Sequence, residues 1–116
     1  MAPELDPVIH QPTRLRLMTV LHRNRQASFT DLRDGCGLTP GNLASHAARL
    51  EEAGYIRSGR VLVDLSFEVQ YRITDQGSEA FKAYLAALQS LIDAARGLPP
   101  PGPAPEPGAV PDPSPA

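Results

Sequence analysis

The sequence is poor in residues that carry redox, metal or covalent chemistry. It has one cysteine, no tryptophan and three histidines in 116 residues. A single cysteine excludes an internal disulfide and any metal site built from several cysteines. The sequence also lacks paired carboxylates, a nucleophile beside a base, and a glycine-rich phosphate loop. We therefore expect no catalytic residue, no metal and no cofactor, and the chain is not expected to be an enzyme.

An excess of positive charge and a long apolar run are also missing. Eleven Lys and Arg stand against thirteen Asp and Glu, and two of the acids, Glu106 and Asp112, lie near the C-terminus. A nearly neutral chain gives no electrostatic argument for nucleic acid unless its cations cluster. No stretch approaches the ~20 apolar residues of a membrane span, and the acidic start is not a secretion signal. We expect a cytoplasmic protein without a membrane partner.

Proline is concentrated at one end of the chain. Residues 97–116 hold nine of the thirteen prolines and three of the nine glycines. Such a segment buries too little apolar surface to offset the entropy of ordering it. We expect a disordered Pro-rich tail over 97–116 and a single folded domain over 1–96.

Apolar residues at helical spacing predict three helices in the first half of that domain. The first runs from Pro12 to about His22, and a short second helix over 31–35 is capped by Thr30. A tight turn leads to the third helix, which Thr39 caps and Gly54 ends. Its apolar side chains fall on one side and small or polar ones on the other. The inward residues are Leu43, Ala47 and Leu50, and the outward ones include Asn42, Ser45 and Arg49.

A period-two alternation follows, and then a last helix. The odd positions from Val61 to Ile73 are apolar or aromatic, which predicts a β-hairpin. Its turn is expected within 64–66, although that stretch has no Gly, Pro or Asn. Thr74 is expected to cap a long helix over 75–95.

Several short motifs together carry a family resemblance. They are Phe29-Thr30-Asp31-Leu32, Leu38-Thr39-Pro40-Gly41-Asn42-Leu43, Leu50-Glu51-Glu52-Ala53-Gly54-Tyr55-Ile56 and Tyr71-Arg72-Ile73-Thr74. In this order and spacing the sequence resembles the small winged helix-turn-helix transcriptional regulators related to the MarR and ArsR groups. The resemblance implies a mainly α fold with a small β-hairpin: a three-helix core, a wing hairpin and a long C-terminal helix. It also implies a dimer that binds operator DNA, with the third helix in the major groove.

The candidate contacts to double-stranded DNA lie on the third helix and the hairpin. Arginine can bind guanine and asparagine can bind adenine, and a helix N-terminus can hold a phosphate. The candidates are Thr39, Asn42, Ser45, His46, Arg49 and Arg60. The alternative for the outward helix face is simple solvation, and for His46 a packing or backbone-bonding role. A further basic cluster is expected to be solvated, the alternative being a contact to the DNA backbone: Arg14, Arg16, Arg23, Arg25 and His22.

The wing departs from the family pattern. Relatives typically carry a basic tip, whereas residues 64–69 here contain two acids and three large apolar side chains. Such a hairpin either folds back on its own domain, burying the odd-numbered face, or is a protein-binding or dimerising wing. The residues expected at a protein interface are Leu62, Val63, Leu65 and Phe67. The alternative function is therefore a protein-interaction module, a co-regulator or antagonist of another regulator, that has lost much of its DNA affinity.

The apolar repeat of the last helix is longer than a small body can cover. We expect a homodimer through this helix. The interface residues are expected to be Phe81, Tyr84, Leu85, Leu88, Leu91 and Ile92.

Overall fold

The computed structural model describes residues 4–97, and it confirms the predicted architecture. Four helices and three strands follow one another in the described residues. They are α1 (Pro12–Asn24), β1 (Gln26–Ser28), α2 (Phe29–Cys36), α3 (Pro40–Glu52), β2 (Ile56–Val63), β3 (Ser66–Ile73) and α4 (Asp75–Ala95). The fold is mainly α with a small hairpin, as predicted. The tail predicted over 97–116 lies, except for Gly97, outside the described residues.

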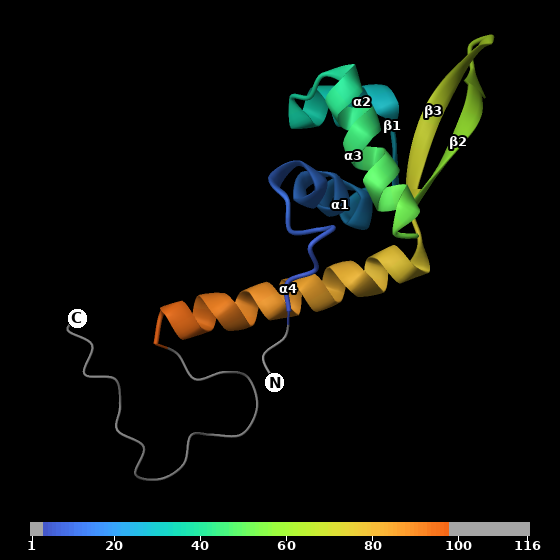
Figure 1. The fold of residues 1–116 in the computed structure, drawn as a ribbon. Coiled ribbons are helices and arrows are strands. Elements are labelled where there is room, and N and C mark those ends of the chain that lie inside the picture. The colour runs from blue at the N-terminus through green and yellow to red at the C-terminus, as the bar shows by residue number, and fades with distance from the viewer. Residues whose placement is uncertain (1–3, 98–116) are drawn as a thin grey trace, which may run out of the picture.

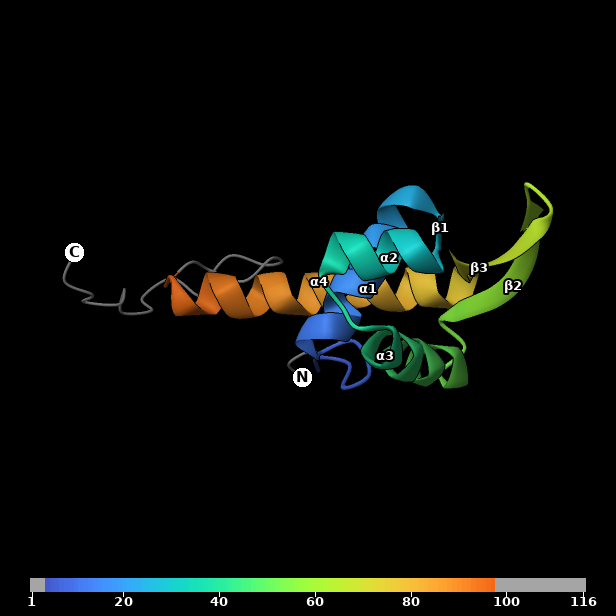
Figure 2. The same ribbon diagram turned by 90° about the horizontal axis from the view of Figure 1, so that it is seen from above.

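The three short helices gather on one side of α4, and the hairpin projects from the end of this group (Figure 1). Seen from above, the C-terminal part of α4 extends past the other helices (Figure 2). The core lies where α1, α2 and α3 meet the root of the hairpin and the first half of α4. Its members include Ile9, Leu17, Met18, Leu21, Leu32, Leu43, Leu50, Ile56, Ile73, Phe81 and Tyr84.

Helix caps define where the elements begin. Thr39 and Thr74 cap α3 and α4 as predicted. The cap of α2 is Ser28, whose Oγ accepts a hydrogen bond from the backbone N–H of Asp31 at 3.0 Å. The prediction of Thr30 as this cap was wrong, because Ser28 ends β1 in the extended conformation that a cap needs. Thr30 already lies inside the helix.

The three strands form an antiparallel sheet in the order β1-β3-β2. The hairpin turn is two residues long, Asp64 and Leu65, and both have positive φ, 48° and 69°. Val63 therefore pairs with Ser66, so an odd-numbered residue of β2 always faces an even-numbered residue of β3. The prediction that the odd-numbered residues share one face was wrong for this reason. They lie on one face in β2 and on the opposite face in β3.

Burial divides the hairpin into a root and an exposed part. Near the root, Tyr71 and Ile73 are buried in the core. Farther out, Phe67 is 68% exposed and Leu65 is 96% exposed. β1 pairs with β3 only over 70–72, so it does not reach the outer residues. The hairpin does not fold back on the domain, and that alternative is wrong (Figure 1).

The hairpin root is fixed tightly on the start of α4. The backbone N–H of Thr74 donates to the carbonyl oxygen of Tyr55 at 3.0 Å. Gly77 lies so close to this carbonyl that a Cβ there would stand 2.0 Å from the oxygen. Gly54, which follows α3, has φ +80°, as predicted for the residue that ends the helix. These contacts set the direction in which the wing leaves the body.

Candidate nucleic-acid interface

The first part of the candidate site is α3. Its apolar face is buried in the core, so its polar face is the one exposed to solvent. Thr39 Oγ1 accepts a hydrogen bond from the backbone N–H of Asn42 at 3.1 Å. Leu43, Ala47 and Leu50 are at most 1% exposed. This packing fixes the rotation of the helix about its axis, so the outward residues cannot be exchanged for inward ones without unpacking the core.

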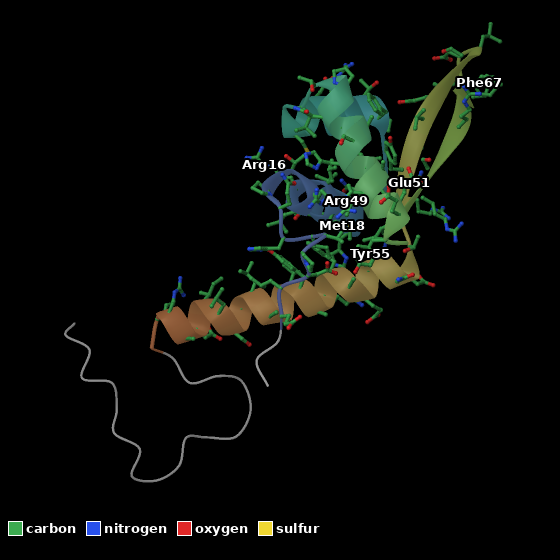
Figure 3. The ribbon with its side chains drawn as sticks, viewed as in Figure 1. Arg16, Met18, Arg49, Glu51, Tyr55 and Phe67 are labelled. Atoms are coloured by element: carbon green, nitrogen blue, oxygen red, sulfur yellow. The ribbon has the colours of Figure 1, made fainter. Side chains whose placement is uncertain are left out.

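The outward face of α3 carries Asn42, Ser45 and Arg49, and all three side chains are exposed as predicted. Arg49 is the one Lys or Arg in α3. Its guanidinium lies 3.5 Å from the carboxylate of Glu52, and both side chains are exposed. Figure 3 shows Arg49 and Glu51 on α3 near the root of the wing. An exposed ion pair contributes little to stability, so Arg49 remains free to exchange Glu52 for another anion.

His46 connects α3 to the N-terminal segment through Arg14. Arg14 Nη1 donates to His46 Nδ1 at 3.1 Å, and Arg14 Nε donates to the carbonyl oxygen of Val8. Partial burial lowers the pKa of His46, and the neighbouring Arg14 charge lowers it further. His46 is therefore held neutral, as the acceptor of this bond. The prediction that Arg14 is simply solvated was wrong, because its guanidinium joins the N-terminal segment to α3.

A second link holds the same N-terminal turn against the end of α3. The hydroxyl of Tyr55 donates to Asp6 Oδ2, while Asp6 Oδ1 accepts from the backbone N–H of Val8 at 2.8 Å. The hydrogen bond to Asp6, together with burial and the carboxylate charge, raises the pKa of Tyr55 to about 12. Residues 6–8 thus fix both the middle and the end of α3.

The root of the wing holds cations that sequence reasoning missed. Arg57 of β2 lies directly opposite Arg72 of β3, and Gln26 of β1 lies on the other side of Arg72. Both arginines are exposed and border a hollow of about 230 Å³. Their proximity depends on the hairpin register, which the sequence pattern left open. The predicted Arg60 lies farther out, with its guanidinium carbon 5.7 Å from the centre of the Phe67 ring.

Comparison with known proteins decides the family. Residues 13–92 match the family model described as a winged helix DNA-binding domain. The chain belongs to this winged helix family. The match covers α1 to nearly the end of α4, so it includes the helix-turn-helix, the hairpin and most of the last helix. The resemblance predicted from the sequence is confirmed at this level.

Individual proteins resemble the whole winged helix domain. A transcriptional regulator homologue from Pyrococcus horikoshii OT3 is 35% identical, with a TM-score of 0.72, over 76% of this chain and 87% of that one. The antimony-specific transcriptional repressor AntR is 26% identical, with a TM-score of 0.59, over 77% of this chain and 75% of that one. An uncharacterized protein of Methanocaldococcus jannaschii is 26% identical over 72% of this chain and 91% of its own length.

The outer wing, residues 61–69, is the part of this winged helix that fits a DNA contact least well. Leu62 and Phe67 face each other across the strands and are exposed, and Leu65 projects from the turn. Asp64 and Glu68 add two negative charges, and there is no Lys or Arg in this stretch. Figure 3 shows Phe67 well away from the helices. Phosphate contacts are therefore unfavourable at the tip.

The last helix of the winged helix domain offers an apolar surface smaller than the sequence predicted. Phe81 and Tyr84 are each 2% exposed and belong to the chain's own core. Their predicted place in a dimer interface is wrong, because they already pack against α1 and the N-terminal segment. The exposed or half-buried remainder is Leu85, Leu88, Leu91 and Ile92.

No ion-binding cluster or membrane-spanning helix accompanies these surfaces in the part of the chain that the structure describes. No group of three His, Cys, Asp or Glu side chains is placed to hold a metal ion within residues 4–97. The helices of the same stretch are too short or too polar to cross a membrane.

Proposed function

We propose that this winged helix protein is a transcriptional regulator that binds operator DNA, with α3 in the major groove and the wing root on the flanking backbone. The observation that carries the proposal is the exposed strip of Asn42, Ser45 and Arg49 on the helix-turn-helix of a DNA-binding family. The similarity to the Pyrococcus horikoshii regulator homologue and to AntR supports a regulatory role.

The chemistry of the strip suits bases and phosphates. Arg49 can bind the O6 and N7 atoms of guanine, and Asn42 can bind adenine. The backbone N–H of Gly41 in the first turn of α3 can donate to a phosphate, whereas Pro40 has no N–H and that of Asn42 already donates to Thr39. Arg57 and Arg72 add two positive charges at the wing root. The full set of proposed contacts is Thr39, Asn42, Ser45, His46, Arg49, Arg57, Arg60 and Arg72.

A fluorescence anisotropy titration at low salt, with the DNA upstream of the protein's own gene, tests this function. We expect binding whose affinity falls steeply with salt. In Arg49→Ala, affinity falls and the salt slope decreases by about one, because one phosphate or base contact is lost. Arg96→Ala removes the same charge at the far end of α4 and serves as the control. Equal losses in both variants, or no binding at low salt, would contradict the proposal.

We also infer that the regulator is a homodimer through the C-terminal half of α4. Leu91 is 55% exposed, and with Leu85, Leu88 and Ile92 it forms an apolar strip beyond the three-helix group. Light scattering of the full chain should give a dimer. Leu91→Glu should shift it to the monomer, whereas Ala86→Glu, on the opposite side of the helix, should not. A monomeric wild type at micromolar concentration would exclude this dimer.

A second candidate function is a protein-interaction module, and the outer wing favours it. Leu62, Leu65 and Phe67 are all more than half exposed, next to Asp64 and Glu68. Such a surface is better suited to protein than to the phosphate backbone. In a pull-down, the double variant with Leu65→Lys and Phe67→Lys should lose partners that the wild type retains. Unchanged recovery with the still-folded double variant would reject the wing as the interface.

A further inference from the structure

The outer wing has a free strand edge as well as exposed side chains. In the sheet order β1-β3-β2, the outer edge of β2 is paired with no other strand of the described residues. The hairpin projects away from the helices in both views (Figures 1 and 2). β2 contains neither Lys nor Pro, the residues that often prevent strands from pairing at an edge. Every second residue of β2 directs its N–H and C=O away from β3, and since Val63 pairs with Ser66 across the turn, the groups of Arg60 and Leu62 are open to another strand.

Both faces of the outer wing carry exposed apolar side chains, although Glu68 and Ser66 also lie on the second face. On one face Leu62 is opposite Phe67. On the other face lie Val61 and Val63, which are 43% and 40% exposed. A strand added at the edge of β2 would continue both faces, and it would cover apolar side chains on each.

The sequence of β2 is complementary to itself in one antiparallel register. When two identical antiparallel strands are related by a two-fold axis normal to the sheet, one residue faces its own equivalent. If that residue is Leu62, Val61 of each copy faces Val63 of the other, and Arg60 of each copy lies beside the other copy's Asp64, the turn residue that follows β2. Centring the pair on Val61 would instead put Arg60 opposite Leu62. Centring it on Val63 would put Leu62 opposite Asp64.

We propose that the wing binds the wing of a second copy of this chain, by antiparallel pairing of the two β2 strands with Leu62 opposite Leu62. This proposal rests on the second candidate function, the wing as a protein-binding surface, and names its partner. The two three-stranded sheets join into one. One face then carries a continuous apolar row, from Phe67 and Leu62 of one copy to Leu62 and Phe67 of the other.

The geometry keeps the two bodies apart and leaves α4 free. Because the strands are antiparallel and only the outer residues pair, each body lies beyond the tip of the other wing. The exposed apolar strip of α4 lies at the opposite end of the molecule (Figure 1). Five residues per strand bury less than the ~800 Å² per partner of a typical stable interface. The wing contact is therefore weak and forms when copies are concentrated, for example on neighbouring DNA sites.

Sedimentation velocity of the full chain, without DNA, tests the register. The Leu91→Glu substitution removes the contact proposed for α4, so any remaining self-association is due to the wing. We expect the Leu91→Glu protein to self-associate as its concentration rises from low micromolar to submillimolar. Adding Leu62→Lys or Leu62→Glu should each weaken this association by roughly tenfold, because like charges face each other. An equimolar mixture of the two should associate again, since Lys then faces Glu.

Two further variants separate this pairing from other uses of the wing. Arg60→Asp should weaken association, and adding Asp64→Arg in the same chain should restore it. Leu65 belongs to the exposed surface of the wing but lies outside the strand pairing, so Leu65→Lys should weaken self-association less than Leu62→Lys. Leu62 is 60% exposed, so these variants should retain the wild-type melting temperature.

Several outcomes would overturn the proposal. They are absence of association in the Leu91→Glu protein, failure of the Lys and Glu variants to associate when mixed, and equal weakening by Leu65→Lys. Loss of a different protein partner by Leu62→Lys, without any change in self-association, would retain the wing as a protein surface but overturn self-pairing. If Leu62→Ser lowers the affinity for DNA and the Leu91→Glu protein does not self-associate, the wing is a DNA contact and the proposal is overturned.

Discussion

Helix α3 and the outer wing both have regularly spaced apolar residues, but their surroundings differ completely. In α3 the apolar side chains Leu43 and Leu50 are fully buried, and the polar ones are exposed. In the outer wing Leu62, Leu65 and Phe67 are exposed. The same kind of pattern thus has opposite outcomes. Regular apolar spacing indicates that one face of an element is suited to packing. It does not indicate whether that face packs against the same chain or against another molecule.

The cause of this difference is what lies opposite each element. α3 packs against α1, α2 and the root of β2, whereas the outer parts of β2 and β3 pair with each other and, within residues 4–97, keep their large apolar side chains exposed. The two regions therefore differ in what a mutation does: in α3 it acts on folding, and in the wing it acts on association. The following experiments test this difference.

The largest effect is expected from truncating a leucine in α3. Leu50→Ala removes a fully buried side chain and leaves a cavity, which should lower the free energy of unfolding by about 2–5 kcal/mol. The same truncation at Leu65, which is 96% exposed, should change it by less than about 0.5 kcal/mol. Urea unfolding followed by circular dichroism measures both. Similar losses at the two positions would mean that the wing packs on the body in solution.

Two glycines, one in the first turn of α4 and one within β2, sharpen the same contrast. A methyl group at Gly77 would collide with the Tyr55 carbonyl, so Gly77→Ala should destabilise the protein by about 1–3 kcal/mol. Nothing lies within 4 Å of a Cβ added at Gly59 in the exposed strand, and Gly59→Ala should be nearly neutral. Thermal unfolding of the two variants checks this. A neutral Gly77→Ala would show that the hairpin root is looser than described.

The hairpin turn gives a smaller effect of opposite sign. Leu65 has φ +69°, a conformation that costs a non-glycine residue about 1 kcal/mol or more. Leu65→Gly should relieve this strain and stabilise the pairing of β2 with β3 by about 1 kcal/mol. Hydrogen exchange of the β2 and β3 amides should slow accordingly, while the amides of α3 keep their rates. Faster exchange in the wing would contradict the strained turn.

The smallest effect concerns pH and is expected near α3. Burial and Arg14 lower the folded-state pKa of His46 below its usual 6.5, so the unfolded chain takes up this proton first as the pH falls. The stability contributed by neutral His46 is therefore complete above pH 6.5 and declines as the pH falls below that value. Unfolding free energies of the wild type and of His46→Gln, measured between about pH 7.5 and about pH 5, isolate this contribution. Parallel pH profiles would exclude it.

Much of the fold could be predicted because local chemistry determines it. Thr39 and Thr74 cap their helices, Gly54 ends α3, and the bounds of α4 agree with the apolar spacing. The outward residues of α3 followed from the same periodicity. These features depend on neighbours within about one helical turn, which a sequence displays directly.

The rest depended on contacts that spacing does not reveal. A two-residue turn in place of a three-residue one moves every side chain of one strand to the other face, which misplaced the odd-numbered residues. Phe81 and Tyr84 fit an interface as well as a core by pattern alone. The Arg14 to His46 bond joins residues distant in sequence, and the facing pair of Arg57 and Arg72 required the strand register.

The buried Cys36 gives this protein a built-in reporter. It is the one cysteine of the chain, it lies at the end of α2 just before the turn to α3, and burial raises its pKa. A thiol reagent in native buffer can therefore react only when this turn opens, so the labelling rate measures the opening equilibrium of the helix-turn-helix. Any ligand that holds α3 in place should slow the labelling, and its affinity can be read without attaching a dye.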